Sequence, residues 1–185
     1  MMKNSRFEVR LSGSGGQGLI LAGIILAEAA SIYEGKEAVQ TQSYGPESRG
    51  GASKSEVVIS SEEIDYPKVT SPDLLLAMMQ EACDKYIRDV KPGAIVILDE
   101  TLVESWPKDL QAKIYPLPLT MIAQEASGKT IVANIVALGA IVALSGIVSK
   151  EAVEKAVLAR VPKGTKEMNK KALYAGFEAA EKLAT

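Results

Sequence analysis

The sequence contains no histidine and a single cysteine, Cys83. Without histidine the chain cannot form Ser-His-Asp or Cys-His nucleophile pairs, a histidine metal site or a histidine general base. One cysteine excludes a disulfide within the chain and an iron–sulfur cluster held by the chain's own thiolates. We therefore expect a reducing, cytoplasmic location. Any catalysis must depend on carboxylates and lysines, or lie on another chain or cofactor.

The chain also lacks a large net charge of either sign. The formal net charge is −2 over 185 residues, so no electrostatic footprint for nucleic acid is predicted, and no run of like charges marks a membrane-surface segment. Residues 131–148 hold no charge, a length at the short limit for a bilayer span, and lack flanking aromatic residues. We interpret this segment as a buried helix and expect no membrane association.

Strands and helices alternate along the chain. Short apolar runs predict strands at residues 6–11, 38–42, 52–60, 74–78, 94–98 and 112–117. Helices are predicted at residues 19–33, 80–89, 118–127, 132–145, 150–160 and 166–184. The alternation predicts one α/β domain over residues 1–185, a three-layer α/β/α sandwich with a mostly parallel, mixed sheet and a Rossmann-like start. The third strand follows its neighbour closely enough to run antiparallel to it.

Two predicted helical segments, residues 18–27 and 131–144, are apolar on all sides instead of along one stripe. A helix at the surface of a domain needs a polar face, so both segments require burial on every side. We expect a partner chain to cover their outer side. The alternative is that the C-terminal helices of the same chain fold over them.

A glycine-rich turn follows the first predicted strand and opens the first helix. Gly13, Gly15 and Gly18 match the pattern G-x-G-x-x-G. Free N–H groups at a helix start, together with the helix dipole, favour a phosphate or another anion, whereas the plainer alternative is a tight turn without a ligand. A dinucleotide site also needs an acidic residue at the end of the second strand, and residues 41–43 at that end include none. A standard NAD pocket is therefore not predicted.

A second glycine-rich segment, residues 42–51, places Tyr44, Glu47 and Arg49 among small residues. The planar guanidinium of an arginine in such surroundings can hold a carboxylate or a phosphate in a two-pronged contact. Because this segment follows the second strand, we expect it at the same carboxyl edge of the sheet as the first turn. We interpret it as a binding loop, with a solvated surface loop as the alternative.

Taken together, Gly-Ser-Gly-Gly-Gln-Gly at residues 13–18 and Gln-Ser-Tyr-Gly-Pro-Glu-Ser-Arg-Gly-Gly at residues 42–51 resemble the gamma subunit of 2-oxoacid:ferredoxin oxidoreductases. The segment at residues 130–139 is similar to that family's helix with an early asparagine, here Asn134. The resemblance covers the whole chain in order. By its length the chain is most similar to the gamma subunits of 2-oxoglutarate enzymes, with pyruvate and branched-chain or aryl 2-oxoacids as open alternatives.

The resemblance implies a subunit that is not active alone. In this family a 2-oxoacid is decarboxylated with thiamine diphosphate and Mg²⁺, electrons pass through iron–sulfur clusters to ferredoxin, and the acyl group passes to coenzyme A. Thiamine diphosphate, Mg²⁺ and the clusters are expected on the alpha, beta and ferredoxin-like delta subunits, and no metal is expected on this chain. Two alternatives from other classes are a free-standing nucleotide-binding protein and a scaffold subunit without a ligand.

The resemblance also implies the candidate site. Its two loops contact either coenzyme A or a partner subunit, and Asn134 is a candidate interface residue. The loop residues assigned in this way are Gly13, Gly15, Gly16, Gln17, Gly18, Ser43, Tyr44, Gly45, Pro46, Glu47, Arg49, Gly50 and Gly51. No catalytic residue is assigned. Asp99 ends a core strand, where catalytic carboxylates often lie, but without an evident partner acid or base we favour a structural role, as we do for Cys83.

Overall fold

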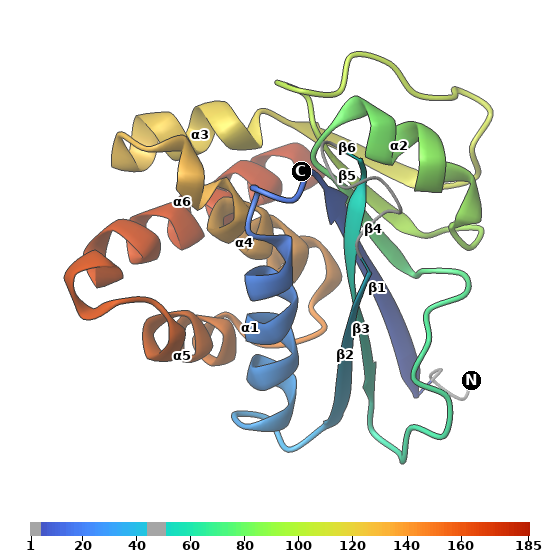
Figure 1. Cartoon of the computed structure of the whole chain (residues 1–185), viewed down its shortest axis with the longest axis horizontal. Coiled ribbons are helices and arrows are strands. Elements are labelled where there is room, and N and C mark those ends of the chain that lie inside the picture. The colour runs from blue at the N-terminus through green and yellow to red at the C-terminus, as the bar shows by residue number, and fades with distance from the viewer. Residues whose placement is uncertain (1–4, 44–50) are drawn as a thin grey trace.

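The computed structural model describes residues 5–43 and 51–185. These residues form a six-stranded sheet in the order β2-β3-β1-β4-β5-β6 (Figure 1). The parallel strands are β1 (Arg6–Gly13), β4 (Leu74–Ala77), β5 (Ile95–Asp99) and β6 (Lys113–Leu117). Strand β3 (Ser53–Ser60) runs antiparallel to both β1 and β2 (Glu37–Ser43). The predicted α/β class with a mixed, mostly parallel sheet is confirmed.

The helices cover the two faces of the sheet unequally. They are α1 (Leu19–Ser31), α2 (Gln80–Tyr86), α3 (Leu119–Ser127), α4 (Ala133–Ser145), α5 (Lys150–Arg160) and α6 (Lys166–Ala184). Short 3-10 turns lie at Ile87–Asp89, Thr130–Val132 and Lys163–Thr165. Helix α2 packs on one face, and the other five helices gather on the opposite face (Figure 1). None of the helices that the structure describes combines the length and the apolarity that a membrane crossing requires.

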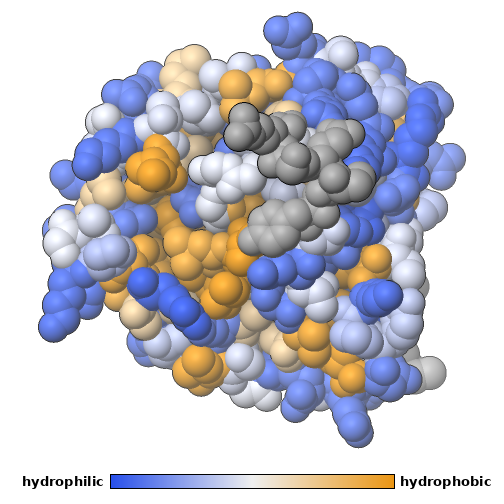
Figure 2. Space-filling view, in the orientation of Figure 1, coloured by the Kyte–Doolittle hydropathy of each residue, from blue (hydrophilic) through white to orange (hydrophobic). Residues whose placement is uncertain are grey.

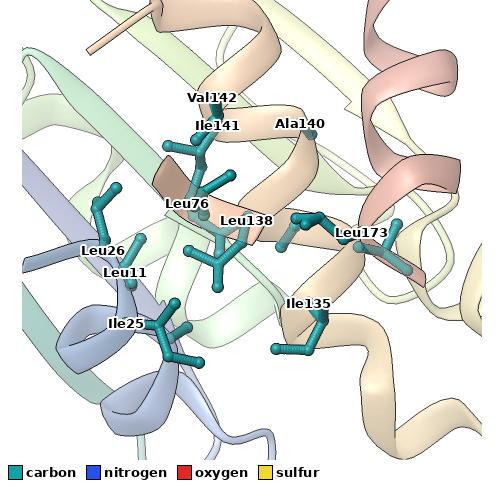
Figure 3. Close-up of a cluster of buried hydrophobic side chains, with 14 of the residues drawn as sticks. Leu11, Ile25, Leu26, Leu76, Ile135, Leu138, Ala140, Ile141, Val142 and Leu173 are labelled. Atoms are coloured by element: carbon teal, nitrogen blue, oxygen red, sulfur yellow. The ribbon is translucent and has the colours of Figure 1, made fainter. Parts of the chain in front are cut away.

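Strand β4 shows why its apolar run is continuous. Leu76 packs into the large cluster beneath α1 and α4, and Leu75 points to the smaller cluster beneath α2. Figure 3 shows Leu76 beside Leu11 of β1 and Leu138 of α4. A central parallel strand is covered on both faces, so both sets of alternating side chains are apolar.

Strand β1 instead buries charge on its second face. Phe7, Val9 and Leu11 face the helical layer, as the alternation predicts. Arg10 is 4% exposed on the other face. Its guanidinium donates to Glu56 at 2.8 Å and to Asp89 at 2.7 Å. Buried charges persist only when they are paired and hydrogen-bonded, so this network allows a polar strand face to lie inside the fold.

Helix α4 is buried by the chain itself. Every residue from Ala133 to Val142 is buried, and α6 packs along the helix while α1, α3 and α5 also contact it. The expectation that a partner chain covers this segment is therefore wrong for α4, and the C-terminal helices provide the cover. Helix α1 keeps a partly exposed side, on which Leu21 is 36% exposed.

The crossing of α4 and α6 depends on two glycines. A Cβ at Gly139 would lie 2.3 Å from the Leu173 carbonyl oxygen, and a Cβ at Gly176 would lie 2.1 Å from the Val136 carbonyl oxygen. Both obstacles are backbone atoms, which cannot move aside as a flexible side chain can. The two helices therefore approach each other backbone to backbone.

We predict that Gly139→Ala and Gly176→Ala each lower the free energy of unfolding by about 1–3 kcal/mol, the usual cost of overpacking. Thermal or denaturant unfolding of the purified chain measures this change. Gly164→Ala is the matched control, because a Cβ there meets no heavy atom within 4 Å. Equal stability of all three variants would contradict the close crossing.

Candidate functional site

The glycine-rich turn and the end of β2 lie at the same edge of the sheet. Gly13, the last residue of β1, pairs with Ser53 of β3, and Ser43, the last residue of β2, pairs with the adjacent Lys54. Only β3 separates the two strand ends, so they are about 10 Å apart at ordinary strand spacing. The prediction that the two loops leave the sheet at one edge is confirmed for the strand ends.

The second loop itself falls largely outside the part of the chain that the structure describes. The candidate residues that lie outside it are Tyr44, Gly45, Pro46, Glu47, Arg49 and Gly50. Ser43 is exposed at the end of β2, and Gly51 is half-buried just before β3. These two residues bracket the loop at the sheet edge.

Gln17 shapes the first turn by folding back over it. Its Oε1 accepts a hydrogen bond from the Ser14 N–H at 2.8 Å, and its Nε2 donates to the Met78 carbonyl oxygen at 2.8 Å. The side chain thereby ties the end of β1 to the end of β4. A Cβ at Gly13 would lie 2.2 Å from the Gln17 Oε1. Glycine at position 13 therefore leaves room for the folded-back Gln17 side chain and its two hydrogen bonds, which we call the Gln17 latch.

Gly18 and Asn134 join the starts of α1 and α4. Gly18 has a φ of 72°, in the left-handed region that glycine adopts readily. The Asn134 Nδ2 donates to the Gly18 carbonyl oxygen at 3.0 Å, and the Asn134 Oδ1 accepts from the Ile135 N–H at 2.9 Å. The Asn134 side chain, 5% exposed, therefore holds the two helix N-termini together.

Gly15 and Gly16 differ from their neighbours because the fold does not require glycine at either position. Both are exposed, neither has a positive φ, and a Cβ at either would meet nothing within 4 Å. Glycine at such a position allows another group to approach the backbone closely. The two residues are thus the part of the turn available for contact with a ligand or a partner.

A hollow of about 370 Å³ opens beside this turn. It lies outside the carboxyl ends of β1 and β4. The chain continues from β1 to β2 on one side of the sheet and from β4 to β5 on the other side. Such switch points are the usual binding crevices of open α/β sheets. Its lining combines polar and apolar side chains. The lining residues are Gly16, Gln17, Met78, Leu102, Thr120, Thr130, Ile131 and Ala133.

Several of these residues were not predicted from the sequence. Met78 directly follows a core strand, and Thr130 and Ile131 directly precede the long apolar helix, so both places carried a positional signal. Leu102 and Thr120 carried none, because their approach depends on how the chain after β5 and the start of α3 pack. The hollow thus joins segments that are distant in the sequence.

Asp99 has a structural role at this edge. It is fully buried, and its carboxylate accepts hydrogen bonds from the Thr101 N–H at 3.1 Å and from both the N–H and the hydroxyl of Thr120. These contacts fix the start of α3. The carboxylate is therefore occupied by the fold, and the structural interpretation of Asp99 holds.

Cys83 is enclosed in the cluster beneath α2. Burial, with a smaller contribution from the neighbouring Asp84 carboxylate, raises the pKa of its thiol to about 11. Because the thiolate is the reactive form, a thiol with this pKa is inert at neutral pH. The only cysteine of the chain is a packing residue.

The chain as a whole is similar to proteins of one family. Residues 8–179 match the family model described as pyruvate ferredoxin/flavodoxin oxidoreductase. The chain is 57% identical over 180 residues to the 2-oxoglutarate synthase subunit KorC of Methanocaldococcus jannaschii, covering 96% of each chain.

Solved structures are similar over nearly the whole chain. The gamma subunit of a keto/oxoacid ferredoxin oxidoreductase from Geobacter sulfurreducens has a TM-score of 0.90 at 56% identity, covering 96% of this chain and 98% of that one. A 2-oxoglutarate:ferredoxin oxidoreductase from Magnetococcus marinus, solved with 2-oxoglutarate, coenzyme A and succinyl-CoA, has a TM-score of 0.84 at 25% identity. That match covers 98% of this chain but 32% of the Magnetococcus chain.

Substitutions of Gly13 and Gly16 should differ in their effect on the free energy of unfolding. We predict that Gly13→Ala lowers the free energy of unfolding by about 1–3 kcal/mol, because the new Cβ displaces the Gln17 side chain. Gly16→Ala should leave the free energy of unfolding within about 0.5 kcal/mol of the original, as at an open surface position. Denaturant unfolding of both variants tests the contrast, which fails if Gly16→Ala is the more destabilised of the two.

The thiol of Cys83 offers a second check. At pH 8 the native chain should react with a thiol reagent at least about a hundredfold more slowly than the unfolded chain, because thiolate is scarce and access is blocked. Absorbance of the released chromophore follows the reaction. Equal rates before and after unfolding would show that Cys83 is not enclosed.

Proposed function

The chain belongs to the pyruvate ferredoxin/flavodoxin oxidoreductase family, and we propose that it is the gamma subunit of a complex that oxidises 2-oxoglutarate, forms an acyl-coenzyme A and passes electrons to ferredoxin. It is a subunit of a 2-oxoacid oxidoreductase, and other subunits of that complex are its partners. The 57% identity to a protein named as a subunit of 2-oxoglutarate synthase supports 2-oxoglutarate as the substrate of the complex. A free-standing nucleotide-binding role is not favoured by these relatives.

The residues of the chain support a division of labour within the complex. One buried cysteine cannot supply the thiolates of an iron–sulfur cluster, and the chain has no histidine to serve as a general base. Thiamine diphosphate supplies the decarboxylation chemistry when it is bound, and we assign it with Mg²⁺ and the clusters to the partner subunits. This chain then contributes binding and positioning.

The exposed pair Gly15 and Gly16 is the observation that carries a coenzyme A contact at this edge. The hollow beside them offers the Thr130 hydroxyl for a polar contact and Met78 and Leu102 for apolar ones, while the Thr120 hydroxyl already donates to Asp99. Coenzyme A combines anionic phosphates with a less polar arm, so such a mixed lining suits one portion of the molecule. The volume of about 370 Å³ is at the small end of ligand pockets. The remainder of the coenzyme would extend toward the loop of Arg49 or a partner chain.

The subunit assignment is tested by co-expression with the neighbouring genes of the complex. We expect the chain to co-purify with subunits that carry thiamine diphosphate and iron–sulfur clusters, and 2-oxoglutarate-dependent reduction of ferredoxin to require it. If the chain elutes alone from a sizing column, and those subunits are active without it, the assignment is wrong.

The coenzyme A contact is tested with Arg49→Ala in the assembled complex. Loss of a charge-assisted contact to a phosphate should raise the KM for coenzyme A about tenfold or more, with kcat and the KM for 2-oxoglutarate little changed. Arg88→Ala, at a guanidinium whose only ion pair is a 3.5 Å surface contact among the described residues, is the control. A KM unchanged by both substitutions would indicate a scaffold role for the loop.

A further inference from the structure

Ile131 is the large apolar side chain with the greatest exposure among the described residues. It is 71% exposed, although it opens the uncharged segment whose continuation, α4, is buried. It lies in the 3-10 turn Thr130–Val132, which links α3 to α4. Exposing a large apolar side chain beside other apolar surface is costly, and such patches usually mark interaction sites.

Ile131 borders two hollows. One is the hollow of about 370 Å³ at the glycine-rich turn, and the other has about 290 Å³. Ile131 and Gly16 line both of them. Leu21, Ile135, Val161, Pro162 and Met168 supply apolar lining to the second hollow, and Asn134, Thr165 and Asn169 are among its polar residues.

We use the name Ile131 ridge for the surface formed by the projecting Ile131 side chain and the second hollow beside it. Figure 2 shows apolar surface gathered left of centre, over the region where Figure 1 places α1, α4, α5 and α6. A projecting apolar side chain beside a largely apolar hollow suits the well-packed centre of a protein–protein contact, where a few residues carry most of the binding energy.

Basic side chains flank the Ile131 ridge. Lys129 precedes the turn that carries Ile131, and Lys163 and Lys166 lie on either side of the lining residue Thr165. All three are exposed, and within the described part of the chain none of them forms an ion pair. The exposed Glu167 beside the lining residue Met168 offsets one of these charges, so the rim stays net basic. By contrast, Lys150 and Lys170 elsewhere on the helical face are paired with Glu181 and Glu154. A complementary surface would therefore carry carboxylates around an apolar centre.

The Magnetococcus relative indicates which molecule supplies that surface. Nearly all of this chain matches about a third of that single polypeptide. In the fused protein the equivalent domain is tethered to the remaining two thirds, whereas the match to the 2-oxoglutarate synthase subunit KorC spans 96% of that relative, and a separate subunit of that kind must hold its position by surface contact. An untethered subunit needs an interface of its own to offset the loss of translational and rotational freedom on association.

Resting on the proposed function, we infer that the Ile131 ridge docks the partner subunit that corresponds to the remainder of the fused chain, through an apolar segment flanked by carboxylates. A second copy of this chain suits the ridge poorly. In a two-fold contact each ridge would face its own copy, so the basic flanks would repel each other.

Ile131→Asp in the co-expressed complex tests this docking. The substitution places an unpaired carboxylate at the centre of the contact, and the Kd for the partner subunits should rise about tenfold or more. Ile131→Ala, which adds no charge, should raise it by a smaller factor. Ile32→Asp is the matched control: Ile32 is 66% exposed and follows the C-terminal end of α1, away from the ridge. Circular dichroism of each isolated chain verifies that it is folded.

Selective weakening by the Ile131 substitutions, with Ile32→Asp equal to the original chain, supports the proposal. Assembly unaffected by Ile131→Asp, or weakened equally by Ile32→Asp, overturns it. So does a homodimer of the isolated chain that Ile131→Asp converts to a monomer, or an intact complex in which only the KM for coenzyme A rises. If the original chain does not assemble with the partner subunits at all, the proposed function itself fails. This outcome is distinct from failure of the docking proposal, which is judged only by comparing the variants with an original chain that assembles.

Discussion

Helix α4 has no charged residue, and the structure meets that constraint by enclosing the helix between the sheet and α6. Enclosure of this kind needs close approach, and Gly139 and Gly176 supply it where the two helices cross. Once α4 is fixed, its first turn is fixed as well. Asn134 then holds Gly18 at the start of α1, and Ile131 projects at the surface. The position of the candidate site thus follows from the packing of one buried helix.

The glycines of the first turn serve different physical purposes, although they form one short motif. Gly13 leaves room for the Gln17 latch, and Gly18 adopts a left-handed φ under Asn134. Gly15 and Gly16 meet neither of these requirements, because a Cβ at either position would contact nothing and neither has a positive φ. Where the fold accounts for a residue, its identity says little about function. Where the fold makes no demand, as at Gly15 and Gly16, the residue is a candidate for the contact that we propose.

The polar groups inside the domain are occupied by the fold. Within the described residues, every buried side-chain nitrogen and oxygen has a hydrogen-bond partner. Asp99 fixes the start of α3, Arg10 is paired with Glu56 and Asp89, and the Cys83 thiol is held protonated by burial. Such a domain suits the positioning role that we propose for it within the complex.

The sequence by itself determined the elements, because local apolar periodicity and turn residues set them: α5 and α6 have the predicted bounds, and the other elements differ by one to a few residues. The paired glycine-rich motifs also determined the family. Only the tertiary structure decided what covers α4, since an all-apolar helix signals burial without saying which segment provides it. The hydrogen bonds of Gln17 to Met78 and of Asn134 to Gly18 likewise join residues 61 and 116 positions apart, and periodicity along the chain carries no information about contacts at that separation.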